Sequence, residues 1–264
     1  MSVDMDIDMG DLSVDERRQK TLEMIEKKGK VRVNELSALF AISEVTIRND
    51  LTELEKAGLL ERTHGGAIST NKAYFNMNFS ERITKYESEK REIALAAVRL
   101  IEPGDTVTIN SGTTTYFIAQ ELKKLSALTV VTNSIVVAQE LAPNNRFNII
   151  LLGGNYNPKY QFTYGENAVQ QLLKYRTDKL ILSADGVSFE HGLTTHHHQE
   201  AEISRTMIER VGQTIVVADF SKIGRENFAQ IAPISAIDIL ITNQSADLEE
   251  LNRMRDSGIN VITV

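Results

Sequence analysis

Seven short runs of β-branched and other apolar residues recur along the last two-thirds of the chain, and they constrain its fold more than any other feature. Amphipathic segments of helical length separate most of them. The runs are Thr106–Ile109, Leu128–Val131, Asn148–Leu152, Lys179–Leu182, Thr214–Val217, Asp238–Ile241 and Ile259–Val264. Strands that alternate with helices in this way build a mostly parallel sheet with helices on both faces. Residues 87–264, which open with a predicted helix near Glu87–Ile101, are therefore expected to form one α/β domain.

Residues 15–72 show a different pattern, that of three short helices and a hairpin. The predicted helices span Asp15–Lys28, Glu35–Ala41 and Glu44–Ala57. Asn34 and Ser43 are the expected N-caps of the second and third helices. Two short apolar segments then flank a four-residue turn that contains Gly65 and Gly66. This order of elements predicts a winged helix-turn-helix domain, in which the third helix would enter the major groove of DNA.

The polar residues of the third helix and of the hairpin, or wing, are candidate DNA contacts. Arg and Asn side chains bond base edges in bidentate geometry, and hydroxyls reach phosphate oxygens. The candidates are Ser43, Thr46, Arg48, Asn49, Thr52, Arg62, His64, Gly65 and Gly66. From periodicity alone, a small helical interaction domain with a solvated polar face is as well supported as a DNA-binding domain. The segment has eleven Lys and Arg against ten Asp and Glu, so the positions of its cations matter more than their number.

Polar and glycine-rich segments follow five of the predicted strands. In an open α/β sheet the carboxyl ends of the strands line one crevice, where ligands bind. The segments are Asn110–Thr115, Thr132–Ser134, Gly153-Gly154, Asp185-Gly186 and Asp219–Lys222. The first of them opens a helix and supplies free N–H groups and hydroxyls that suit a phosphate, although it lacks the Gly-Lys-Ser/Thr ending of a P-loop. Turn chemistry explains any single loop, but five at strand ends favour a ligand site.

Charged residues near these loops complete the expected site. Lys222 and Arg205 are the cations best placed to complement a phosphate. Asp185, Glu200 and Glu202 are candidate acceptors for sugar hydroxyls, and Glu202 is alternatively a solvated charge on a helix face. His196-His197-His198 invites a metal interpretation. Consecutive loop histidines point in different directions, however, and no carboxylate stands at helical zinc spacing, so a structural or sugar-contacting loop is favoured and no metal or other cofactor is expected.

Arg17 through Ala67 resembles the N-terminal domain of the DeoR-family bacterial transcriptional regulators. The resemblance is carried by Arg18–Lys20, Val33–Leu36, Ser43–Leu51 and His64–Ala67. It implies that Ser43–Leu51 begins the recognition helix and that the Gly-Gly turn is the wing. Asp50 is expected to have a structural hydrogen-bonding role, because an acid that faced phosphate would repel it. Asn49 replaces a basic residue that many members carry, so operator preference does not transfer.

The second part resembles the C-terminal sensor domain of the same family, so the match covers nearly the whole chain after residue 15. The additional motifs are Gly192–Thr195, Glu200–Glu202 with Arg205, and Ser221-Lys222. That domain is similar to ribose-5-phosphate isomerase and senses phosphorylated sugars. The resemblance implies an effector site of Asn110, Ser111, Gly112, Thr113, Thr114, Thr132, Asn133, Gly153, Gly154, Asp185, Gly186, Thr195, His196, Glu200, Arg205 and Lys222. The Thr195-His196 and Arg48–Asp50 stretches are most similar to members that control N-acetylgalactosamine or other amino-sugar use.

This sequence departs from the family pattern at several positions of the sensor domain. Asn110 stands where an Asp is usual, Ser204 where a Lys often precedes the Arg, and Phe220 and Ile223 alter the run around Lys222. Asn110 and Ser204 cannot serve as a general base or as a cation. The exact contacts of the ligand therefore do not transfer from the family.

Composition narrows the remaining choices. The formal charge of −7 argues against a general polyelectrolyte binder, and the absence of cysteine excludes disulfides and thiolate chemistry. The absence of cysteine also fits a reducing cytoplasm. No apolar stretch reaches spanning length, and the acidic residues 1–14 are expected to form a disordered tail rather than a signal peptide. Residues 73–86 are expected to be a polar linker.

Three functions fit these features. The leading one is a transcriptional regulator, expected to be a repressor of carbohydrate use, which binds duplex operator DNA as a homodimer or homotetramer and responds to a phosphorylated sugar. The alternative is a sugar-phosphate isomerase with an appended domain, in which Glu200 or Asp185 would be the base. A structural interaction module is the third, but it leaves the strand-end loops unexplained.

Overall fold

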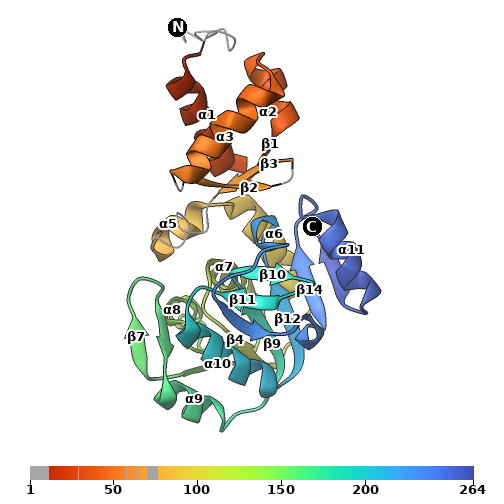
Figure 1. Ribbon diagram of the computed structural model, residues 1–264. Helices are drawn as coiled ribbons and strands as arrows, with labels where there is room; N and C mark the ends of the chain where they lie inside the picture. Colours follow the sequence, from red (N-terminus) through yellow and green to blue (C-terminus); the bar gives the residue numbers. More distant parts are fainter. Residues whose placement is uncertain (1–11, 29, 58, 64, 70–76) are drawn as a thin grey trace, which may run out of the picture. The chain divides into compact units, whose positions relative to one another are not determined.

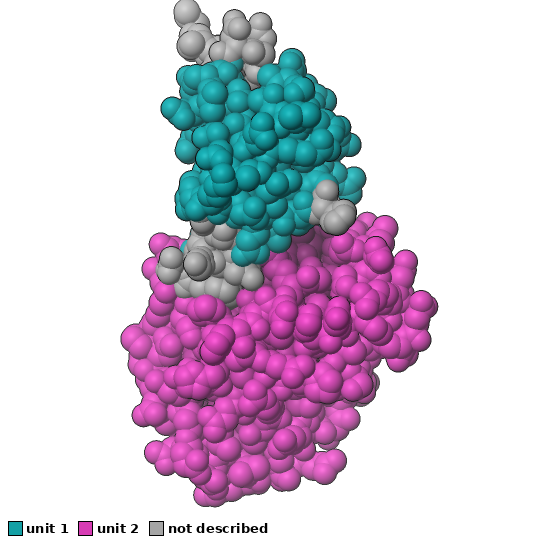
Figure 2. Space-filling model, in the orientation of Figure 1, with its two compact units in different colours: residues 1–77 teal, residues 78–264 magenta. Residues whose placement is uncertain are grey.

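The chain divides into two compact units, Met1–Met77 and Asn78–Val264, which Figure 2 shows in teal and magenta. The structure is a computed structural model that describes residues 12–28, 30–57, 59–63, 65–69 and 77–264. The tail predicted at 1–14, the wing residue His64 and the first part of the predicted linker therefore lie wholly or mostly outside the described residues. No helix in the described ranges is long and apolar enough to cross a membrane.

The first unit has the three helices and the hairpin that its sequence predicts. Its elements are α1 (Val14–Lys28), β1 (Lys30–Arg32), α2 (Val33–Phe40), α3 (Glu44–Lys56), β2 (Leu60–Thr63) and β3 (Gly66–Ser69). The three strands form an antiparallel sheet in the order β1-β3-β2. Leu36, Phe40, Ile47 and Leu51 are fully buried between the helices and the sheet. The winged helix-turn-helix fold is thus confirmed.

The caps of α2 and α3 determine where these two helices begin and end. The Ser43 side chain accepts a hydrogen bond from Thr46 N–H, so Ser43 is the N-cap that the sequence predicts. Asn34 is not the N-cap of α2: the helix begins at Val33, two residues before the predicted start, and its N-cap is Arg32, which makes no side-chain cap bond. The helix ends because Ala41 adopts the left-handed conformation, with φ 53°.

The second unit is built on one parallel sheet of seven strands in the order β15-β14-β12-β9-β4-β5-β6, of which Figure 1 labels β14, β12, β9 and β4. All seven predicted runs form these strands. They are β4 (Thr106–Ile109), β5 (Leu128–Thr132), β6 (Phe147–Leu151), β9 (Thr177–Ser183), β12 (Val211–Val217), β14 (Ile239–Thr242) and β15 (Asn260–Thr263). Because β12, β9, β4 and β5 are consecutive neighbours, the loops at their C-terminal ends lie along the same edge of the sheet.

Helices cover both faces of this sheet, as predicted. One apolar core contains residues of α6 (Glu87–Val98), α7 (Thr113–Leu122) and α8 (Ile135–Leu141). The other contains residues of α9 (Glu166–Leu172), α10 (His198–Glu209) and α11 (Leu248–Asp256). Successive residues of one strand enter different cores, as Leu180 and Ile181 of β9 do. The alternation of burial along the strands is the physical reason for two layers of helices.

Some elements of the second unit are absent from the sequence prediction. They are the hairpin β7 (Asn155–Asn157) and β8 (Phe162–Tyr164), the small sheet of β10 (Gly186–Ser188), β11 (Gly192–Thr195) and β13 (Ala229–Ala232), and the 3-10 turns at Phe220–Lys222 and Ile234–Ala236. Helix α5 (Phe79–Thr84) lies within the predicted linker 73–86. A capping box between Asn78 and Glu81 and the burial of Phe79 stabilise it, so residues 79–84 are a structured part of the second unit.

Candidate functional site

The exposed face of α3 presents the residues that are predicted to read DNA. Arg48 and Asn49 are exposed and Thr46 is half-buried. Arg48 Nη2 lies 2.6 Å from Glu44 Oε2, one turn earlier on the same solvated face. Val45, which the sequence prediction omitted, leaves 65% of its surface exposed beside them. An exposed apolar side chain at this place suits the methyl group of thymine.

Two of the predicted contact residues join the wing to the recognition helix instead of standing free. Arg62 Nη1 on β2 donates to Thr52 Oγ1 on α3 at 2.9 Å, and Arg62 N–H donates to Glu55 Oε1. Gly66 is buried where a β-carbon would lie 1.9 Å from Val31 O, so the wing requires glycine at this position. Gly65 is exposed, and its carbonyl accepts a hydrogen bond from Val33 N–H.

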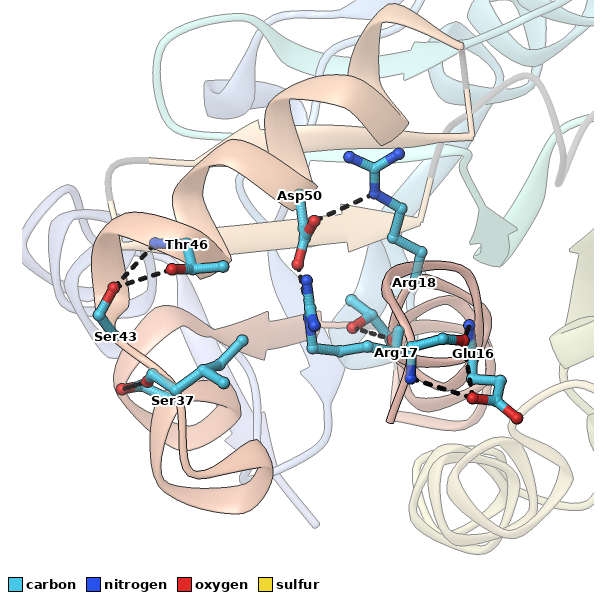
Figure 3. Close-up of polar contacts among 10 residues, drawn as sticks. Glu16, Arg17, Arg18, Ser37, Ser43, Thr46 and Asp50 are labelled. Atoms are coloured by element: carbon cyan, nitrogen blue, oxygen red, sulfur yellow. Dashed lines mark hydrogen bonds and ion pairs between the residues drawn. The ribbon is translucent and has the colours of Figure 1, made fainter. Parts of the chain in front are cut away.

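Asp50 is a buried anchor between α3 and α1, as Figure 3 shows. Its two carboxylate oxygens accept hydrogen bonds from Arg17 Nε at 2.7 Å and from Arg18 Nε at 3.1 Å. The Arg17 and Asp50 side chains are each less than a tenth exposed. The structural role that the sequence predicts for Asp50 is therefore confirmed, and the recognition helix is fixed to α1 by charge as well as by apolar packing.

The loop after β4 is held in place by its own polar side chains. Asn110 Nδ2 donates to Ser183 O, and Asn110 Oδ1 accepts from Ser183 N–H, both at 2.8 Å, so this side chain extends the pairing of β4 with β9. A β-carbon on Gly112 would lie 2.0 Å from Ser183 Oγ. Gly112 is also the N-cap of α7, and no side chain caps the first N–H groups of that helix, an arrangement that suits an anion.

The next two loops use most of their polar groups internally. Thr132 Oγ1 donates to Ile109 O, and the Asn133 side chain joins Ser111 N–H to Thr163 O. Gly153 N–H donates to the Gln171 side chain, and a β-carbon on Gly154 would lie 2.5 Å from Tyr164 O. These residues shape the edge of the sheet. Turn chemistry, the alternative considered from the sequence, accounts for Gly153 and Gly154.

Four charged residues, which we call the charged cluster, meet beyond the end of β9: Arg82, Asp185, Glu200 and Lys222. Arg82 Nη1 lies 3.6 Å from Asp185 Oδ1, and both side chains are 12% exposed. Asp185 Oδ2 accepts a hydrogen bond from His196 N–H at 3.1 Å. Thr195 Oγ1 lies 2.9 Å from both Asp185 Oδ2 and Glu200 Oε2. The sequence prediction included three of these four residues and missed Arg82.

Burial and mutual charge shift the pKa values of the charged cluster. Burial lowers the pKa of Lys222 to about 7, although Asp219 and Asp185 act to raise it. Burial, and then the charge of Asp185, raises the pKa of Glu200 to about 8. Burial also acts to raise the pKa of Asp185, but Arg82 and Lys222 outweigh it and hold that pKa below its ordinary value. The opposite directions of the two pKa shifts favour a proton on Glu200 and an ionised Asp185.

The other predicted residues lie around this cluster or apart from it. A β-carbon on Gly186 would lie 2.5 Å from Arg225 O, so Gly186 serves the close approach of that loop. Arg205 is directed to β13, where it donates to Gln230 O, and not toward the cluster.

His196 is exposed, and His197 packs on Tyr160 with ring centroids 4.6 Å apart. In the described part of the chain, no three His, Cys, Asp or Glu residues are arranged to hold a metal ion.

Comparison with protein families gives two matches in the order of the two units. The model of the DeoR-like helix-turn-helix domain matches residues 17–73, and that of the DeoR C terminal sensor domain matches residues 85–244. The chain belongs to the DeoR family. It is therefore a transcriptional regulator with a DeoR-type reader and sensor, and the family resemblance seen in the sequence is confirmed.

Curated relatives match this DeoR-family chain over nearly its whole length. A putative aga operon transcriptional repressor of Escherichia coli O157:H7 is 36% identical over 94% of this chain and 93% of its own. A lactose phosphotransferase system repressor of Streptococcus mutans is 35% identical over 90% and 96%. Among solved structures, a D-ribose-5-phosphate isomerase in complex with phospho-erythronic acid aligns with TM-score 0.40 and 20% identity over 52% of this chain and 54% of that chain.

Proposed function

We propose that this regulator represses an operon of carbohydrate use and that a phosphorylated sugar or amino sugar controls its binding to DNA. The observation that carries the effector proposal is the buried charged cluster beside the uncapped start of α7. Gly112 packs on Ser183, two residues before Asp185, so the free N–H groups and the cluster belong to one site. The N–H groups suit a phosphate, Lys222 adds a cation, and Asp185 accepts from sugar hydroxyls. We call this place the strand-end site.

A panel of sugar phosphates tests the strand-end site. Ribose 5-phosphate, glucose 6-phosphate, galactosamine 6-phosphate and N-acetylgalactosamine 6-phosphate are compared with the same sugars without phosphate, by thermal shift and then by calorimetry on the full chain. A ligand that binds the folded state raises the melting temperature by mass action. We expect at least one phosphate ester, and none of the free sugars, to do so. No binding across the panel would contradict the effector proposal.

We further propose that the effector is bound and not converted. A regulator that consumed its signal would erase it, and the Asn110 side chain is occupied by the backbone of Ser183. NMR of each bound sugar phosphate over several hours is expected to match the protein-free control. Interconversion of aldose and ketose phosphates above that control would show an isomerase instead.

Replacing Arg48 with alanine is expected to weaken binding to a selected operator. If Arg48 leaves Glu44 to bond a guanine in bidentate fashion, the loss is about 1–3 kcal/mol and base preference relaxes at one position. Titration of labelled duplexes with each base at that position measures both effects. Lys56→Ala, at the other end of α3 and paired with Glu53, is the matched control and should leave affinity nearly unchanged. Equal weakening for all sequences would point to a phosphate contact, and unchanged affinity would contradict both roles.

We also propose a homo-oligomer of even order that spans paired half-sites. The helix-turn-helix segment at residues 15–72 has nearly balanced charge, so one copy is expected to bind weakly and two linked copies to gain affinity through effective concentration. Light scattering of the full chain, free and with a duplex that contains two half-sites, is expected to give an even number of copies. A monomer in both samples would refute this proposal.

A further inference from the structure

Helix α5 is the element through which the chain enters the second unit. Strand β3 of the wing ends at Ser69, and α5 begins at Phe79 as the first element after the boundary at residues 77 and 78. A ligand that binds the second unit can alter the DNA affinity of the first only if some element changes between the two states. Helix α5 follows the boundary between the units directly, so it can be this element if its residues contact the ligand site.

The contacts of α5 lead to the strand-end site. At its start, Phe79 N–H donates to Lys159 O at 3.0 Å, and the Phe79 ring packs nearly at right angles to the Tyr116 ring on α7. In its last turn, the Arg82 guanidinium lies 3.6 Å from Asp185 and stands 4.6 Å from the centroid of the Tyr160 ring. Asp185 belongs to the site, Tyr116 lies on α7, and Tyr160 borders the loop after β4, since Ser111 Oγ donates to Tyr160 O. A change at the site therefore acts directly on α5.

The backbone at the end of α5 is bound to α6. The buried ammonium of Lys90 on α6 donates to Arg82 O at 2.6 Å and to Lys85 O at 2.5 Å. The backbone at the end of α5 is thus held by one buried cation, while the Arg82 side chain is held by Asp185 and Tyr160. Because these bonds fix the end of α5 to α6, the part of α5 that can pivot lies before the turn at Lys85 and Tyr86, where Tyr86 adopts φ 54°.

The bond between Arg82 and Asp185 is suited to exchange. Its shortest distance, 3.6 Å, is longer than the 2.7 Å between Arg17 and Asp50, which is a charge-assisted hydrogen bond of full strength. A sugar hydroxyl offers Asp185 a shorter contact, while the Arg82 guanidinium keeps its contact with the face of the Tyr160 ring. The effector can therefore separate the pair without leaving either charge buried and unpaired, which would be costly.

We propose that Arg82 transmits effector binding to the DNA-binding unit: in the free regulator it ties α5 to Asp185, and the bound sugar phosphate breaks this tie and shifts α5. This inference rests on the effector site proposed above and adds the residue that couples that site to DNA. Arg82 is a positioning residue here, and Asp185 is the group that the effector contacts.

The test measures coupling separately from binding. The coupling is the ratio of the operator dissociation constants of the full chain with and without a saturating amount of the tightest-binding sugar phosphate of the panel. Allosteric ratios are commonly about 5- to 150-fold. We expect the unmodified chain to lie in that range and Arg82→Gln to fall within about twofold of unity while it still binds the sugar phosphate to saturation. Arg99→Gln, at an exposed cation that forms the C-cap of α6, is the matched control and should keep the full ratio.

A second measurement keeps the test sound if Arg82→Gln is unstable. Hydrogen exchange of the peptide that covers residues 79–84 is expected to change when the sugar phosphate binds the unmodified chain. Arg82→Lys retains a cation beside Asp185 and replaces Arg82→Gln if the latter melts early; its ratio is also expected to fall, because a single ammonium does not reproduce the planar contact with Tyr160.

The outcomes separate this inference from the proposed function. If no sugar phosphate binds the unmodified chain, the proposed effector site fails. If one binds and controls DNA affinity, but the folded Arg82 variant keeps the full ratio or the exchange of residues 79–84 does not change, the effector site stands and the transmission by Arg82 is overturned. A variant that folds but can no longer be saturated also overturns it, because Arg82 would then be a ligand contact and not a transmitter.

Discussion

Asp50→Ala is expected to lower the free energy of unfolding of the first unit by about 3–5 kcal/mol, the usual result of removing one partner from a buried ion pair. The change would leave the guanidinium groups of Arg17 and Arg18 without the carboxylate that they share. Urea unfolding of the full chain measures the loss, with the hydrogen exchange of α3 peptides used to monitor the first unit. Operator binding should fail with the fold of this unit, while binding of the sugar phosphate persists.

Glu44→Ala provides the comparison for this prediction. Glu44 is also an acid of α3 paired with an arginine, but both partners are about half exposed, and such pairs contribute little to stability. Its stability should therefore stay close to that of the unmodified chain. If Asp50→Ala were equally mild, the anchor between α1 and α3 would have to be apolar packing alone.

The affinity for an anionic effector is expected to fall by at least about tenfold between pH 7 and pH 9, because a group whose protonation favours binding contributes up to about tenfold per pH unit above its pKa. Two groups of the charged cluster lose a proton in this range. Lys222, with a pKa of about 7, becomes neutral, and Glu200, with a pKa of about 8, becomes negative. Both changes oppose an anion, whereas the phosphate ester is already mostly dianionic above its own pKa of about 6.

Calorimetry at a series of pH values tests this prediction, and two variants divide the effect. Lys222→Met should lose about 1.5–3 kcal/mol of effector binding at pH 7, the range for a hydrogen bond to a charged group, and should flatten the lower part of the profile. Glu200→Gln should flatten the upper part while it keeps the affinity at pH 7. A profile of the unmodified chain that does not change with pH would mean that neither group faces the ligand.

The sequence predicts the framework of the fold well because periodicity and caps are local signals. All seven strands of the parallel sheet, the cap at Ser43 and the structural role of Asp50 follow from residues close together in the chain or from simple charge repulsion. The sequence does not predict helix α5, because six residues contain too few turns for a periodic pattern and its capping box lies in a segment whose polar composition predicts a linker.

The candidate site was predictable only in part, because its partners come from distant segments. Asp185 and Lys222 stand at strand ends, where the fold class itself places ligands. Arg82 and Tyr160 reach the same place from α5 and from the turn before β8, and no local pattern connects them. Conversely, Arg205 matches the motif but points to Gln230, since the direction of a helical side chain depends on packing. The exposed Val45 shows the same limit, because burial decides whether an apolar residue is core or surface.

The hydroxyl of Thr195 has one hydrogen and lies at hydrogen-bonding distance from two carboxyl groups, those of Asp185 and Glu200. If it donates to one carboxylate, the other carboxyl group must be protonated to donate to the Thr195 oxygen, so the two carboxyl groups share one dissociable proton in this arrangement. A sugar hydroxyl that enters brings its own donor and competes with Thr195. If binding raises or lowers the population of that hydrogen, buffer molecules supply or take up the difference. The heat of effector binding would then vary with the ionisation enthalpy of the buffer. The same exchange of protons would make the affinity for the effector depend on pH.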